Sequence, residues 1–102
     1  MSNMEKINKY LNNLSKIDKV MKLDDLISED FYVVNYYRYS FCDAEGRNIA
    51  KESLCDIEKN LAKRKEITSD SCFDDVRSVY LEYEEACLRL VQRYRKEIAL
   101  YE

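Results

Sequence analysis

The stretch SCFDDVRSVYLEYEEACLRLVQRYRKEIALYE, residues 71–102, decides the fold class of this chain. Its apolar residues recur at steps of three and four, at Val76, Tyr80, Tyr83, Cys87, Leu90, Tyr94, Ile98 and Tyr101. This spacing places side chains on one face of an α-helix. Acidic residues fill the first half and basic residues the second, the order that a helix dipole favours. The sequence therefore predicts a long C-terminal helix, capped at Ser71 and buried around Leu90.

Two earlier segments repeat the helical pattern. The first, Asn3 to Lys22, can be capped by Ser2 or Asn3, and its apolar residues are Met4, Ile7, Leu11, Leu14, Ile17 and Met21. The other follows a cap at Asn48, and its apolar residues are Ala50, Leu54, Ile57 and Leu61. Between them, Leu23-Asp24-Asp25 predicts a break and a new start, because aspartate is favoured at helix N-caps.

The segment FYVVNYYRYSF, residues 31–41, fits two structures. Its β-branched and aromatic residues are typical of a strand, which could form a hairpin over 31–53. A helical seam also passes through it and can end at Gly46, just past the helix C-terminus. A lone two-stranded hairpin is marginally stable, so we favour the helix. We predict an all-α, four-helix antiparallel bundle over residues 1–102 as a single domain, its last helix the longest. The alternative is an α+β fold of three helices and that hairpin.

Composition supports few, long elements. The 102 residues include one glycine and no proline, whereas sandwiches and barrels need many such turn residues. The net charge of −3 does not favour nucleic acid as a general partner. No apolar run reaches 18 residues, and the N-terminus lacks the apolar core of a signal peptide. We therefore expect a cytoplasmic protein without a membrane partner.

The residues that commonly carry catalysis are scarce. The chain has no histidine, the commonest general base and triad member. Its four cysteines, Cys42, Cys55, Cys72 and Cys87, show no CxxC spacing and are expected to be small buried apolar residues rather than zinc ligands. We expect no enzyme activity, no cofactor and no metal.

Aromatic and apolar residues in excess of one core predict a binding surface. Nine tyrosines occur, and those near Arg38 cannot all share one buried face. Tyrosine combines an apolar ring with a polar tip and is enriched at interfaces. On the last helix, leucines also lie off the main seam. These residues either border the core or bind a partner; the partner-binding candidates are Tyr32, Tyr36, Arg38, Tyr39, Leu81, Leu88 and Leu100.

These observations favour a small, non-enzymatic protein-interaction module. One form of such a module is a phage or mobile-element inhibitor that docks on a host protein. A second hypothesis is a structural homo-oligomer that self-associates through the C-terminal helix. A third is a nucleic-acid- or nucleotide-binding protein that uses Lys63, Arg64 and Lys65, although three basic residues at a helix end are more simply explained by the helix dipole.

Overall fold

Three long α-helices make up the fold. The computed structural model describes residues 2–102, of which the helical elements are α1 (Asn3–Tyr37), η1 (Arg38–Ser40), α2 (Ala44–Thr68), η2 (Ser71–Val76) and α3 (Arg77–Ala99). The structure is 91% helical, and the described residues form no strand. The all-α class is therefore confirmed. The four-helix bundle is wrong, and so is the hairpin over 31–53.

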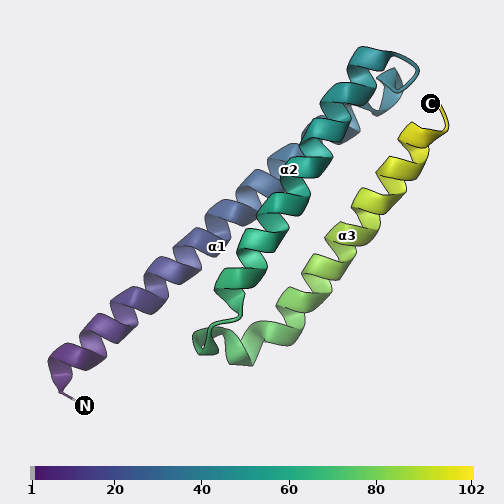
Figure 1. Cartoon of the computed structure of the whole chain (residues 1–102). Coiled ribbons are helices and arrows are strands. Elements are labelled where there is room, and N and C mark those ends of the chain that lie inside the picture. The colour runs from purple at the N-terminus through teal and green to yellow at the C-terminus, as the bar shows by residue number, and fades with distance from the viewer. Residues whose placement is uncertain (1) are drawn as a thin grey trace.

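The helices lie antiparallel in chain order and form an elongated molecule of 62 × 21 × 15 Å (Figure 1). The N-terminal part of α1 runs well past the turn that joins α2 to α3 (Figure 1). The first buried residue of α1 is Val20. We call residues 3–21 the arm. Its first part projects beyond the three-helix body, and its last part, from Lys16, lies beside the turn between α2 and α3.

The predicted break at Leu23-Asp24-Asp25 does not occur, because α1 passes through it. Asp24 accepts a hydrogen bond from Nε of Arg64 at 2.6 Å, so its carboxylate is satisfied from within a helix and has no capping role. No glycine or proline lies nearby to end the helix. As a result, two predicted helices are one, and α1, with 35 residues, is longer than the last helix, with 23.

The second helix begins earlier than predicted. Asp43 caps it by accepting a hydrogen bond from the backbone N–H of Glu45, whereas Asn48 lies inside the helix. Gly46 does not end the preceding helix and has no positive φ; it is buried in the first turn of α2. A Cβ atom there would collide with the carbonyl oxygen of Ser40. Glycine therefore allows α2 to pass close to η1.

The core runs along the inner faces of all three helices. It contains Ile27, Val34, Phe41, Ala50, Leu54, Ile57, Leu61, Cys87, Val91, Tyr94 and Ile98. The seam predicted for α2 is buried as expected. On α3 the prediction is partly wrong, since Leu90 is 36% exposed and Val91 is 2% exposed. Apolar residues occupy most of the circumference of α3, so spacing alone could not identify the arc that faces α1 and α2.

The start of α3 also differs from the prediction. Asp70, not Ser71, is the cap, and its side chain accepts a hydrogen bond from the N–H of Cys72 at 3.0 Å. The next residues form the 3₁₀ segment η2, so the α-helical phase begins only at Arg77. Val76 therefore lies outside the α3 seam and is exposed.

Arg64 joins the three helices from inside the body. Its side chain is 2% exposed, and it donates to Asp24 on α1 at 2.6 Å and to Glu84 on α3 at 3.4 Å. The rings of Tyr80 and Tyr83 lie with their centroids 4.5 Å from its Cζ atom. Carboxylates and aromatic faces are the partners that a desolvated guanidinium needs.

We predict that Arg64→Ala lowers the free energy of unfolding by about 3 kcal/mol or more, because it leaves the buried Glu84 carboxylate without its partner. Lys65→Ala, a change at the exposed neighbour, should stay within about 0.5 kcal/mol. Urea denaturation followed by circular dichroism measures both. Equal small losses for the two variants would contradict the role of Arg64.

We predict that Val91→Asp abolishes cooperative unfolding, because it places an unpaired charge in the core. The same substitution one residue earlier, Leu90→Asp, should cost only about 1 kcal/mol, because this side chain is partly solvated. Thermal melts of the two variants compare them directly. A more severe loss in Leu90→Asp would place the seam where the sequence predicted it.

Candidate interaction surfaces

Three of the predicted partner-binding residues meet at one end of the body. Arg38, Tyr39 and Leu100 line a hollow of about 350 Å³, which we call the end hollow. Its remaining lining residues are Phe41, Glu97 and Tyr101. Tyr39 is 93% exposed and Leu100 is 82% exposed. Two large apolar side chains therefore stand in water beside a concave surface.

Local structure explains how the end hollow is built. The 3₁₀ turn η1 follows α1 directly and carries Arg38 and Tyr39, while Phe41 is buried beneath them. On the other side, α3 ends at Ala99, so Leu100 lies just past the helix. Arg38 donates from Nε and Nη2 to the two carboxylate oxygens of Glu97, at 2.8 and 2.7 Å. This two-point bond fixes one wall of the hollow.

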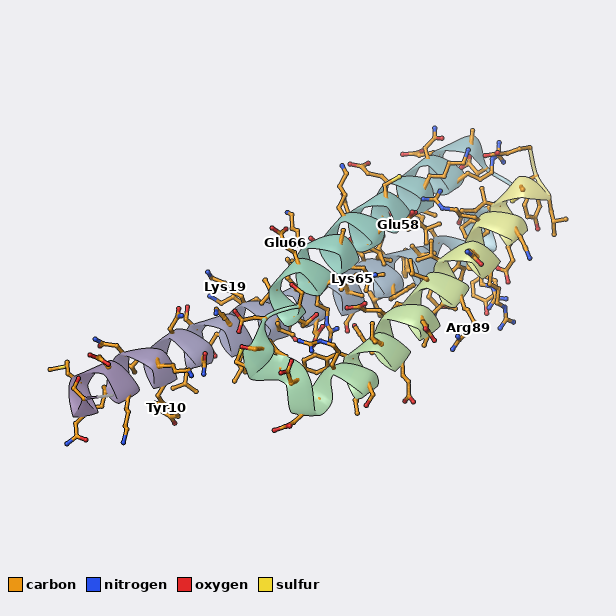
Figure 2. The ribbon with its side chains drawn as sticks, turned by 60° about the horizontal axis from the view of Figure 1, so that its bottom comes forward. Tyr10, Lys19, Glu58, Lys65, Glu66 and Arg89 are labelled. Carbon is orange, nitrogen blue, oxygen red and sulfur yellow. The ribbon has the colours of Figure 1, made fainter. Side chains whose placement is uncertain are left out.

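A basic strip adjoins the end hollow. Arg89, Gln92, Arg93 and Lys96 line a second depression of about 440 Å³, which shares Glu97 and Leu100 with the end hollow. Arg93 forms only a long ion pair with Glu97, at 3.8 Å. Arg89 and Lys96 form no ion pair with any residue that the structure describes, and Arg89 lies on the outer side of α3 (Figure 2). The strip therefore offers free positive charge.

The other predicted partner-binding residues are not brought into this site. Tyr32 and Tyr36 are exposed on α1, and the ring of Tyr36 packs edge-on against Tyr37 at 5.1 Å. Leu81 and Leu88 are partly exposed on α3 and do not line the end hollow. The tyrosines near Arg38 that were predicted to bind a partner are thus divided between different surfaces. The same is true of the leucines that lie off the main seam of the last helix.

The basic residues Lys63, Arg64 and Lys65 do not form a common surface. Arg64 lies in the interior, as described above, and cannot contact a nucleic acid. Lys63 lines a shallow depression on the α1–α2 side, together with Lys19. Arg95, one of the late arginines, is bonded to Glu58 of α2. The sequence pattern does not indicate which of the three adjacent cations, Lys63, Arg64 or Lys65, is buried.

The arm carries a surface that sequence reasoning misassigned. Its predicted core residues are exposed by 39–67%; they are Met4, Ile7, Leu11, Leu14, Ile17 and Met21, and Tyr10 is exposed among them (Figure 2). The prediction that this face packs in a bundle is therefore wrong. A signal was present in the sequence: at 3.6 residues per turn, the centre of this face lies about 150° from the line through Val20, Ile27 and Val34.

The base of the arm is fastened to the body. Nζ of Lys16 donates to Oδ2 of Asp70 at 2.6 Å, which joins α1 to the start of η2. This hydrogen bond holds the pKa of Asp70 well below its ordinary value. At the other end of the arm, Ser2, one of the two predicted caps, accepts a hydrogen bond from the N–H of Glu5 at 3.2 Å.

The four cysteines differ in exposure. Cys42, Cys55 and Cys72 are exposed and only Cys87 is buried, so the expectation of four buried cysteines is wrong. Burial raises the pKa of the Cys87 thiol and of the Tyr83 phenol beside it, which keeps both groups protonated. Among residues 2–102, no three potential metal ligands come together.

Comparisons with known proteins identify no relative of the chain. No protein-family model, curated protein or solved structure matches the chain. Within the described part of the chain, every helix is too polar or too short to cross a membrane.

Proposed function

We propose that the chain is a small interaction module that docks on another protein through the end hollow and has no chemical step of its own. One observation carries the proposal: Tyr39 and Leu100, both almost fully exposed, stand at a hollow whose wall is fixed by the Arg38–Glu97 pair. An exposed aromatic residue beside a preformed concavity is typical of interface hot spots.

Simple energetics favour a covered end hollow. Burying one large apolar side chain is worth about 1.5–3 kcal/mol, so covering Tyr39 and Leu100 together would supply several kcal/mol. Arg38 is already held by Glu97 and would lose little freedom on binding. By covering a functional surface of its partner, such a module could act as an inhibitor.

The charges beside the hollow define the partner's chemistry. Arg89, Arg93 and Lys96 would attract carboxylates, and the hollow has room for one bulky apolar side chain. We therefore expect a protein segment in which a large apolar residue is flanked by aspartate or glutamate. Complementary charge of this kind speeds association and disfavours basic partners.

Two features support a role without chemistry. The sequence has no histidine, and the buried Cys87 is held as a thiol by the rise in its pKa. The charged side chains of the end hollow are paired with each other, which suits positioning rather than proton transfer.

A peptide-display selection against the full chain tests this proposal. The expected enriched peptides carry a bulky apolar residue next to acidic residues. Fluorescence anisotropy should then show that Leu100→Asp weakens binding at least tenfold, since it places a carboxylate where the acidic peptide docks. Arg93→Glu should also weaken binding, and the wild-type affinity should fall as salt is raised.

The matched control is Val79→Asp, which also changes an exposed apolar residue of α3 but lies near the opposite end of that helix. It should bind the selected peptides like the wild type. Enriched peptides without acidic residues, or binding that Leu100→Asp leaves unchanged, would overturn the proposal.

A further inference from the structure

The arm presents an apolar face that no part of the described chain covers. The face consists of Met4, Ile7, Tyr10, Leu11, Leu14, Ile17 and Met21, and we call it the arm face. The arm also contains Asn8, Asn12, Asn13 and Ser15, which are weak helix formers. A helix that packs on nothing is marginal in water, particularly with such residues. A partner would bury the exposed apolar area and stabilise the helix.

The body leaves room for that partner. On α1, the residues that pack into the body, such as Val20 and Ile27, lie about 150° from the centre of the arm face. Lys16, which reaches Asp70, also points to the body side. A second helix laid along the arm face therefore meets neither α2 nor α3.

The spacing of the arm face specifies what kind of helix fits it. In a heptad whose positions are lettered a to g, Met4 and Leu11 occupy position a. Ile7, Leu14 and Met21 occupy position d. We propose that the arms of two copies of this chain pair as an antiparallel coiled coil. In this arrangement each residue at position a contacts a residue at position d of the other copy, and the two residue numbers add up to 25.

This register makes the arm self-complementary at its core. Leu11 meets Leu14 of the second copy at the centre, and Met4 meets Met21 at each end. Because the two-fold axis repeats each contact, four of the six layers are wholly apolar. The remaining two pair Ile7 with Asp18. Closed two-fold pairing of identical surfaces is the commonest form of assembly.

The flanks of the arm face support the same register. In an antiparallel pair, e positions face e positions and g positions face g positions, which brings Asn8 to Ser15 and Tyr10 to Ile17 of the second copy. None of these four residues is charged, so no like charges oppose each other there. Most of the arm's lysines point elsewhere, at b, c and f positions.

Asp18 is the polar residue of the interface. It occupies the remaining a position and costs stability, yet a single polar a residue fixes the register of a coiled coil. Lys22 follows it by four residues, where an opposite charge can partly neutralise the carboxylate. Shifting the pairing by a heptad in one direction would bring Asp18 to Leu14 at the centre, and in the other direction it would reduce the six layers to four.

The area available agrees with a stable but reversible dimer. The seven side chains of the arm face expose on the order of 700 Å² per copy, so pairing would bury on the order of 1,200 Å² in total, at the lower limit of specific interfaces. We therefore expect dissociation constants in the micromolar range. Leu81 and Leu88 of α3 are only two residues and form no continuous seam of this length.

An anionic membrane is a less suitable occupant. Residues 2–22 have five lysines against two acidic residues, a balance found in helices that lie on membranes. Asp18, however, lies within the apolar face and would enter the hydrocarbon boundary. A second copy can place this carboxylate one layer from the end of the interface, within reach of water.

Sedimentation equilibrium of the full chain from about 5 to 500 μM tests the pairing. We expect a monomer–dimer equilibrium in the wild type. Leu11→Asp should weaken dimerisation at least 100-fold, because the symmetry introduces two charges into the central layers, while circular dichroism confirms that the body stays folded. Asp18→Leu should tighten the dimer at least tenfold. The control Leu88→Asp, at the α3 surface, should dimerise like the wild type.

Disulfide trapping tests the orientation. In a background with Cys42, Cys55 and Cys72 replaced by serine, Met4→Cys mixed with Met21→Cys should form the mixed disulfide. Met4→Cys alone should cross-link poorly, whereas a parallel pair would cross-link it to itself.

The outcomes separate this proposal from its alternatives. A wild-type monomer at 500 μM, or a dimer that survives Leu11→Asp, overturns it. A monomer that co-sediments with vesicles of phosphatidylserine and phosphatidylcholine, and loses this on Leu11→Asp, assigns the arm face to a membrane instead. Peptide binding at the end hollow should be unaffected by Leu11→Asp, so either proposal can fail without the other.

Discussion

The buried guanidinium of Arg64 is the contact on which the body depends. It reaches a carboxylate on each of the other two helices and lies against two tyrosine rings of α3. An apolar core of this size would hold three helices in several rotations, since hydrophobic contact is not directional. The hydrogen bonds of Arg64 select one rotation, in which Val91 rather than Leu90 faces inward.

Once that rotation is set, the surplus of apolar residues has to be exposed. The body buries one face of each helix. Many of the remaining apolar side chains gather at the end hollow and the arm face, while others, such as Tyr32 and Leu81, stay on separate surfaces. These two surfaces lie at opposite ends of α1 (Figure 1). The proposed partner and the proposed second copy can therefore be bound at the same time.

The sequence predicted helix content and the α2 seam because both follow from local spacing. It could not predict that Asp24 would be paired inside a helix, and the predicted break there divided one helix into two. It also could not predict that Arg64 would be buried while its neighbours Lys63 and Lys65 stayed in water. These outcomes depend on contacts between residues 20–40 positions apart. For the candidate site, Arg38, Tyr39 and Leu100 were identified singly by their chemistry; only the fold could bring them together.

The uninterrupted length of α1 sets the distance between the two proposed binding surfaces. A helix rises 1.5 Å per residue and turns about 100°, so residue count alone sets the separation and relative direction of anything held at its two ends. Seven residues added to the arm would move its tip about 10 Å outward while nearly preserving the direction of its apolar side. Two or three residues would instead rotate that side away. The reach of this protein can thus change without turning the apolar side only in steps close to whole numbers of helical turns, such as seven or eleven residues.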